Sequence, residues 1–289
     1  MTHVTDRYRE TGGPPLVMCD FTPPRSGDPA ALDRLKVVSA DYFNAAYNPG
    51  KLVRADSVAA AHAARERTGV ETVFNLATRD MNKIALQSRL LGAQMLGLDN
   101  VIVMHGDELT ERETGLGVSS VRDYSSTSLI AAVRAMNDGL DYRGASLGAP
   151  TDFCIGATLD LARDLGAEAA LTRRKADAGA HYFITQPIYS AAERERFLAL
   201  YEETAREPLA TPVLWGVQVL DQDGVIFGNV PAEVRAQLEA GRDGAEAAGE
   251  LLAALVEAGV RGFYLIPPIL RGGRRDYDAA QRALEAIGR

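Results

Sequence analysis

The chain has 289 residues, 46% of them hydrophobic and 24% charged, which is the composition of a globular protein with a sizeable core. Its formal net charge of -8 argues against a protein whose main work is to grip nucleic-acid phosphates. The N-terminal stretch lacks the apolar segment of a signal peptide, and no apolar run approaches the roughly 20 residues of a membrane helix.

The two cysteines, Cys19 and Cys154, fall inside predicted strands, where a cysteine behaves as a small apolar side chain. They imply no disulfide framework, and together with the missing targeting segment this predicts a cytoplasmic protein. The polar residues 1–15 predict a flexible N-terminal arm, followed by one domain over residues 16–289.

Short β-rich runs alternate with amphipathic helical stretches along the chain. Most of the runs are apolar on both faces, as strands covered by helices are. The predicted strands are 16–22, 42–47, 72–77, 100–106, 152–158, 181–187, 212–218 and 262–268. The predicted helices are 29–40, 57–69 with a Ser cap, 80–97 with an Asp cap, 127–139, 167–179, 191–205, 230–240, 244–259 and 277–288.

Eight βα units in a chain of this length predict an α/β fold, a single (βα)8 TIM barrel. The rival is a doubly wound open sheet, whose dinucleotide-binding version is weakened because no GxGxxG follows the first strand. Residues 107–127 form a loop longer than the usual two to six residues, so this segment is a candidate lid or binding loop.

Polar residues stand where several predicted strands end, and in a parallel barrel this is the end that carries the chemistry. Asp20 interrupts the apolar run LVMCDFTPPR before two prolines. A carboxyl group partly removed from water favours its neutral form, so Asp20 is a candidate proton donor. The alternative is a structural role, as a helix cap or as the partner of Arg25 in a salt bridge.

Two further strand ends carry candidate groups. Asp107 follows Gly106, which permits a tight turn or a close approach of a ligand to the backbone. Its carboxylate could stabilise a developing cation or orient a ring nitrogen, or simply lie in solvent. Gln186 offers a donor and an acceptor to the edge of a heterocycle such as a pterin or flavin, unless neighbouring backbone groups use both.

The remaining candidates have weaker signals. Asn75, Thr78 and Arg79 could hydrogen-bond a ribose or phosphate, or merely precede a helix. Tyr47 could stack on a ring, although the Asn-Pro-Gly that follows it is typical of a plain turn. Lys175 ends a basic run on a predicted helix. This run either faces solvent, or Lys175 extends from it to bind an anionic ligand. The four histidines show no metal-ligand spacing, so no metal site is expected.

The segments around these residues resemble the methylenetetrahydrofolate reductase family. Residues 19–25, CDFTPPR, are similar to its first-strand signature Phe-Glu-Phe-x-Pro-Pro-Arg. The other similar segments are NLATRDMNKIALQSRLLGAQMLGLDNVIVMHGD (75–107), RRKADAGAHYFITQPIYS (173–190) and EAGVRGFYLIPP (257–268). The resemblance therefore runs from about residue 16 to residue 268.

The resemblance implies a (βα)8 barrel that reduces 5,10-methylenetetrahydrofolate to 5-methyltetrahydrofolate in one-carbon metabolism and methionine biosynthesis. The hydride would pass from NADH or NADPH through FAD. Asp20 would be the general acid that opens the five-membered ring to an iminium cation, and Asp107 would stabilise that cation or tune the flavin. Folate and nicotinamide are the implied partners, and assembly into a homo-oligomer stays open.

The resemblance also implies a fuller set of binding residues. Those for the substrate are Gln186, Tyr47 and Tyr189. Those for the cofactor are Asn75, Thr78, His105, Gly106, Asp107, Tyr124, Ser125, Glu168 and Lys175.

The chain departs from the family pattern at three places. Asp20 replaces the usual Glu, and His105 replaces the Arg before Gly-Asp. After the fifth strand, GATLDLARD lacks the Tyr and His of a Tyr-Pro-Glu-x-His-Pro segment that contacts FAD, although Tyr124 and Ser125 still match a flavin-contacting pair. Direct hydride transfer from NAD(P)H is therefore an alternative. So are a non-catalytic folate- or flavin-binding barrel, a related one-carbon enzyme of methyl-group catabolism, and a barrel lyase or methyltransferase.

Overall fold

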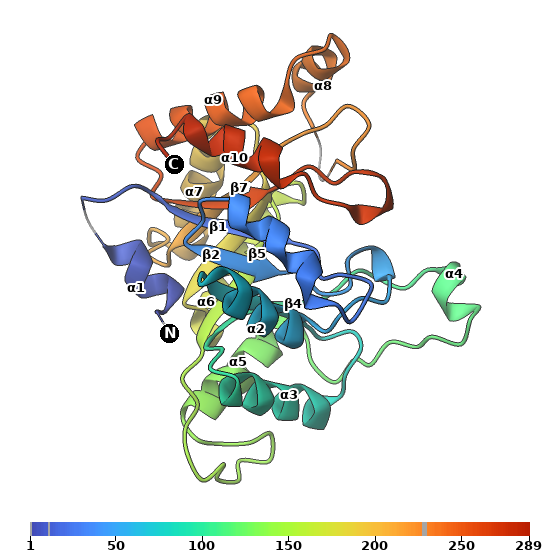
Figure 1. Ribbon diagram of the computed structural model, residues 1–289. Helices are drawn as coiled ribbons and strands as arrows, with labels where there is room; N and C mark the ends of the chain where they lie inside the picture. The colour runs from blue at the N-terminus through green and yellow to red at the C-terminus, as the bar shows by residue number, and fades with distance from the viewer. Residues whose placement is uncertain (1, 11, 227–229) are drawn as a thin grey trace.

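Eight parallel strands close into a barrel in chain order, with β8 paired to β1, in a computed structural model that describes residues 2–10, 12–226 and 230–289. Figure 1 shows the strands surrounded by the helices that connect them. The strands are β1 (Leu16–Phe21), β2 (Tyr42–Ala45), β3 (Glu71–Ala77), β4 (Asn100–Met104), β5 (Cys154–Leu159), β6 (Tyr182–Pro187), β7 (Val213–Gln218) and β8 (Gly262–Ile266). The predicted TIM barrel is confirmed, and the open-sheet alternative is wrong.

The predicted connecting helices lie where the amphipathic stretches placed them, and the described residues add four short ones. The predicted helices are η1 (Pro29–Val37), α2 (Ser57–Thr68), α3 (Lys83–Met95), α5 (Ser126–Asn137), α6 (Leu165–Ala178), α7 (Ala191–Ala205), α8 (Ala232–Glu239), α9 (Gly244–Glu257) and α10 (Tyr277–Glu285). The additions are α1 (Val4–Arg9), the 3-10 turns η2 (Pro49–Lys51) and η3 (Arg271–Gly273), and α4 (Glu111–Thr114), which projects from the barrel within the long loop after β4 (Figure 1).

Two helix starts differ from the sequence prediction. Asp56, not Ser57, caps α2, because its carboxylate accepts the N–H groups of Val58 and Ala59, whereas the Ser57 hydroxyl donates to the Asn75 carbonyl. Asn82, not Asp80, caps α3. The carboxylate of Asp80 instead forms a bidentate ion pair with Arg79. The predicted helix at 29–40 is a 3-10 helix.

The alternation of side chains along the strands divides the core into two parts. One set packs outward against the helices, and the other fills the barrel interior with residues such as Leu16, Met18, Ile102 and Leu214. Two positions beyond this apolar filling, the inward side chains become polar, as at Asp20 and Asn75. The barrel is therefore a packed apolar cylinder with a polar C-terminal mouth.

The N-terminal end of the barrel is covered by α1, which lies at the opposite end of the molecule from α4 (Figure 1). Val4 is fully buried, and its N–H donates to the side chain of Asn100 at 3.0 Å. The carbonyl of Thr2 accepts hydrogen bonds from Asn100 and from the Tyr42 hydroxyl. The segment expected as a flexible arm thus includes a docked helix, while residues 1 and 11 lie outside the described part. A helix this short and polar leaves no amphipathic pattern to detect.

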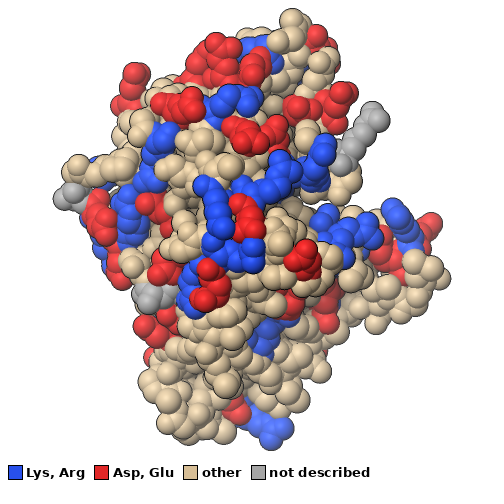
Figure 2. All heavy atoms as spheres, viewed as in Figure 1, with Lys and Arg blue, Asp and Glu red and all other residues tan. Residues whose placement is uncertain are grey.

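Surface charge, helix length and metal-ligating groups indicate which kinds of partner to consider. Acidic and basic side chains are intermixed over the face of the molecule that Figure 2 shows. Among the described helices, none is both long and apolar enough to cross a lipid bilayer. The described residues also contain no group of three His, Cys, Asp or Glu side chains placed to hold a metal ion.

A glycine inside the barrel gives the first testable prediction. A Cβ at Gly156 of β5 would lie 2.7 Å from the Tyr182 hydroxyl oxygen and closer still to its ring carbon. Gly156→Ala should lower the free energy of unfolding by about 1–3 kcal/mol through overpacking. Gly92 in α3 has no heavy atom within 4 Å of such a Cβ, so Gly92→Ala should raise it by up to about 1 kcal/mol. Urea unfolding followed by circular dichroism measures both, and equal stability of Gly156→Ala and wild type would contradict the packing.

Candidate active site

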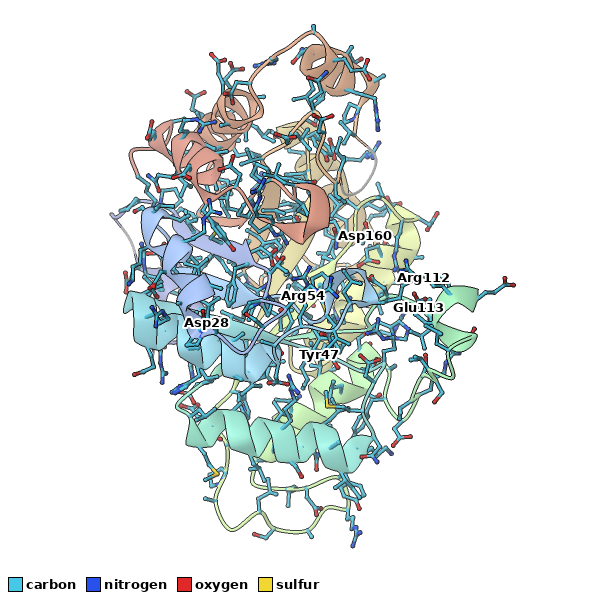
Figure 3. All side chains as sticks on the ribbon, turned by 45° about the vertical axis from the view of Figure 1, so that its right-hand side comes forward. Asp28, Tyr47, Arg54, Arg112, Glu113 and Asp160 are labelled. Atoms are coloured by element: carbon cyan, nitrogen blue, oxygen red, sulfur yellow. The ribbon has the colours of Figure 1, made fainter. Side chains whose placement is uncertain are left out.

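A hollow of about 360 Å³ opens at the C-terminal mouth of the barrel, which we call the central hollow. Its volume lies within the range of small-molecule sites. Six sequence-predicted residues line it together, namely Asp20, Tyr47, Asn75, Gly106, Asp107 and Gln186. The other lining residues are Ala46, Pro49, Gly50, Met104, Asp160, Ala162, Tyr264, Ile266 and Arg275. Segments far apart in the sequence therefore meet at one rim, and Figure 3 labels Tyr47 and Asp160 among them.

Asp20 is only 4% exposed, and its carboxylate is held by three donors. The Tyr264 hydroxyl donates to Oδ1 at 2.8 Å, and Asn44 Nδ2 donates to the same oxygen at 3.4 Å. The guanidinium of Arg275 forms an ion pair with Oδ2. A carboxylate surrounded by donors is satisfied as an anion, because only the ionised form accepts at both oxygens without donating. The predicted alternative partner, Arg25, is exposed on the loop after β1.

Arg275 is the residue that sequence reasoning missed. It is 5% exposed, and its remaining nitrogens donate to the Thr22 hydroxyl at 2.9 Å and to the Pro267 carbonyl at 3.1 Å. It therefore joins the end of β1 to the end of β8. Its sequence signal is weak, since it is one of several arginines in a Gly-rich segment before the last helix.

A second network fixes the wall on the β2 and β3 side. The Tyr47 hydroxyl is hydrogen-bonded to Asp80, and burial together with this carboxylate raises the pKa of Tyr47 to about 12. Arg79 donates two hydrogen bonds to Asp80, at 2.6 and 2.7 Å, and a third to the backbone carbonyl of Asp107 at 2.9 Å. Tyr47 is therefore a neutral side chain at a fixed position, and the loop that carries Asp107 is tied to β3.

A larger hollow of about 620 Å³ adjoins the central one, and we call it the side hollow. Both are lined by Met104, Gly106, Asp107, Asp160 and Gln186. The residues lining only the side hollow are His105, Glu108, Ser126, Thr158, Arg163, Glu168, Leu171 and Lys175. At the shared wall Gly106 has a φ of 89°, and a Cβ there would lie 3.3 Å from the Cβ atoms of Ala77 and Arg79, so glycine suits the position.

Each basic side chain that lines the side hollow already faces an acidic one within the described part of the chain. The pairs are Arg163 with Asp160 at 3.2 Å, Lys175 with Glu168 at 4.0 Å, and His105 with Glu108 at 3.0 Å. The fourth lining carboxylate, that of Asp107, comes in addition to these pairs. The side hollow is therefore acidic on balance.

Lys175 is not part of a solvated helix face. Its ammonium group is buried and donates to the Thr158 carbonyl at 2.5 Å, and burial lowers the pKa of Lys175, which the nearby Glu168 carboxylate partly opposes. Glu168 in turn accepts the Asp160 N–H at 3.1 Å. Lys175 and Glu168 thus hold the end of β5 and the segment after it in place, and their ammonium and carboxylate groups already have partners within the protein.

Four predicted residues lie outside both hollows. Tyr189 lines a separate depression with residues of α8 and α9. Thr78 is buried beneath the loop and donates to the His105 carbonyl at 3.2 Å. Ser125 caps α5, and the ring of Tyr124 lies under the Lys83 ammonium group at 5.1 Å. The structure therefore does not bring these four side chains to the residues around Asp20.

Asp160 is a second residue that the sequence reasoning missed. It directly follows β5 and lines both hollows. The signal was available, because Asp160 directly follows its strand, while Asp107, which was predicted, lies three residues beyond the end of β4. Its carboxylate accepts the Ala162 N–H at 3.0 Å and pairs with Arg163, which fixes its direction.

Comparison with known proteins identifies a family and several structures with the same fold. A family model described as methylenetetrahydrofolate reductase matches residues 7–226. No curated protein matches the chain.

Solved structures share the fold at low sequence identity. A Clostridium thermocellum protein that binds two copies of 5-methyl-5,6,7,8-tetrahydrofolic acid is 13% identical, with a TM-score of 0.65 over 95% of this chain and 96% of that one. DmoA from Hyphomicrobium sulfonivorans is 9% identical, with a TM-score of 0.56 over 96% and 87% of the two chains. A 2,3-dimethylmalate lyase is 15% identical, with a TM-score of 0.52 over 92% and 81%.

The ion pair at Asp20 predicts a large effect on stability. Arg275→Met leaves a buried carboxylate without its cation, which should lower the free energy of unfolding by about 3–5 kcal/mol. Adding Asp20→Asn to this variant should restore part of the loss. Arg282 on α10 pairs with Asp243 at the surface, so Arg282→Met is the matched control and should change stability by less than about 1 kcal/mol. Urea unfolding measures all three, and equal losses for Arg275→Met and Arg282→Met would refute a special role of the pair.

Proposed function

The chain belongs to the methylenetetrahydrofolate reductase family, and from this premise we propose that it reduces 5,10-methylenetetrahydrofolate to 5-methyltetrahydrofolate with NADH or NADPH. The observation that carries the proposal is the central hollow, where Asp20, Asp107 and Gln186 face one small-molecule volume. The folate bound by the Clostridium thermocellum protein, which shares the fold, supports the same substrate class here.

The chemistry needs anionic groups beside a transient cation. In the first step the bond from the bridging methylene to N10 breaks, N10 gains a proton, and the methylene becomes an iminium cation on N5. In the second step hydride adds to that methylene carbon, and the nicotinamide is oxidised. Carboxylates fixed beside the developing positive charge lower the barrier, because they need no reorganisation when it forms.

We assign Asp20 the part of a fixed anion beside this cation. The ion pair with Arg275 supports that assignment over the role of general acid, because a guanidinium only donates and therefore needs the carboxylate as its acceptor. Asp107 is exposed at the same hollow, so we propose it as the group that relays a proton from water to N10. Gln186, exposed at the rim, would hold the pterin.

We propose that hydride passes directly from nicotinamide to folate, across the wall that the two hollows share. The side hollow suits an uncharged or cationic ring, since its lining is acidic on balance. FAD, NADH and NADPH all carry a diphosphate, and because Arg163 and Lys175 are each engaged by a carboxylate within the described residues, that group of any of the three would lie outside the side hollow. The missing Tyr and His after β5 support the direct route over FAD.

A second candidate function is a folate-binding barrel without turnover. The observation that favours it is the Clostridium thermocellum protein, which shares the fold and binds 5-methyl-5,6,7,8-tetrahydrofolic acid. Tight binding of 5-methyltetrahydrofolate without oxidation of NADH or NADPH would establish this alternative.

Turnover of the purified protein tests the proposal. With methylenetetrahydrofolate and NADH or NADPH, we expect 5-methyltetrahydrofolate to form at the same rate with and without added FAD. The protein should be colourless, without the visible absorption bands of a flavin. A yellow protein whose activity is lost with its flavin would replace the direct route by the FAD route. An absence of product under all these conditions would remove the reductase function.

The role of Asp20 predicts a specific kinetic defect. Asp20→Asn should lower kcat by about 100-fold or more, since one fixed charge beside the cation is lost, while the Kd for NADH stays unchanged. Asp33 binds Arg67 on the outer surface, so Asp33→Asn should keep the wild-type rate. If Asp20 were instead the general acid, Asp107→Asn would retain the wild-type single-turnover rate, whereas the proposed roles predict that Asp107→Asn lowers it.

A further inference from the structure

Asn75 has a buried side-chain amide oxygen that no donor among the described residues reaches. It lies on β3, is 3% exposed, and faces the barrel interior where it lines the central hollow. Its Oδ1 has no hydrogen-bond partner among the described residues. The hydrogen bond that reaches this residue from Ser57 goes to its backbone carbonyl instead. Leaving a buried polar atom unpaired costs stability, so such an atom beside a cavity requires an explanation.

Neighbouring residues share part of this pattern but do not reach a hollow. Asn44, which also faces inward near the mouth, has an unpaired Oδ1 too, but its Nδ2 donates to both Asp20 and Tyr264 and the residue lines neither hollow. Thr72, on the same strand as Asn75, has a buried hydroxyl without a partner in the described part, but it lines neither hollow. Asn75 thus combines an unpaired acceptor with a wall position in the site, where a ligand can reach it.

We propose that Asn75 recognises a ring amide edge of the ligand in the central hollow, and that this edge is the lactam of the pterin. Its Oδ1 accepts the ring N3–H and its Nδ2 donates to the neighbouring carbonyl oxygen O4. A carboxamide and a lactam match in this way because each offers one donor beside one acceptor. This inference rests on the proposed function, and it moves Asn75 from the cofactor group, where the sequence resemblance placed it, to the substrate.

The same chemistry has a second source, because the carboxamide of nicotinamide also offers one donor beside one acceptor. The placement of Asn75 favours the pterin. Asn75 lines the central hollow with Asp20, and it does not line the side hollow that we assign to the nicotinamide. The two sources predict different binding defects when the amide is removed.

The test replaces the amide by an apolar group with the same number of heavy atoms. Asn75→Leu should raise the Kd for 5-methyltetrahydrofolate by about 10- to 100-fold, because two hydrogen bonds to the ring are lost. The Kd for NADH should change less than about twofold. The Tm should stay equal or rise, since an unpaired buried acceptor is removed, whereas a structural residue would lower it. Thr72→Val is the matched control and should leave both dissociation constants unchanged.

Each other result overturns the inference. A weaker affinity for NADH with unchanged folate binding would assign Asn75 to the carboxamide of nicotinamide. Unchanged binding of both ligands, with or without a loss of stability, would leave Asn75 a structural residue. Because these are binding measurements, a wild-type protein that binds folate without turnover refutes the reductase function and still tests Asn75. A wild-type protein that binds no folate refutes both.

Discussion

The site depends on one buried electrostatic arrangement, the carboxylate of Asp20 with its three donors. A carboxylate removed from water is unfavourable unless a cation and hydrogen bonds compensate it. Here Arg275, in the segment before α10, supplies the cation. Tyr264 on β8 and Asn44 on β2 supply hydrogen bonds. The family match ends at residue 226, so the residue that fixes the charge of Asp20 lies outside the matched region. The position of the acid is therefore a property of the closed barrel and not of the signature that surrounds it.

The fold could be predicted from the sequence because strands buried on both faces appear as continuous apolar runs. The helices between them repeat their apolar residues every three to four positions instead. All eight strands lie where such runs occur. Helix starts were less certain, because Asp, Ser and Asn near a boundary can all act as caps. Competition for their side chains decides, as when Arg79 engages Asp80 and leaves the cap of α3 to Asn82. The docked helix α1 depends on contacts with distant residues such as Asn100, which no local pattern encodes.

The candidate site could be predicted in part, for a geometric reason. The carboxyl ends of parallel strands meet at one rim, so polar residues at those ends, such as Asp20 and Gln186, converge whatever the loops do. Tyr189 and Tyr124 lie further along the connecting segments, where the path of the backbone and not the strand period sets the direction of a side chain. Arg275 was not predictable, because its role requires a partner 255 residues away in the sequence.

The contact between Asp20 and Arg275 also links the assembly of the site to the order in which the chain folds. The pairing of β8 with β1 closes the ring, and it joins the two strands that are furthest apart in sequence. Loop-closure entropy makes such distant contacts slow to form. Arg275 and Tyr264 reach Asp20 only when β8 lies beside β1, so the charge pair at the mouth exists only in the closed ring.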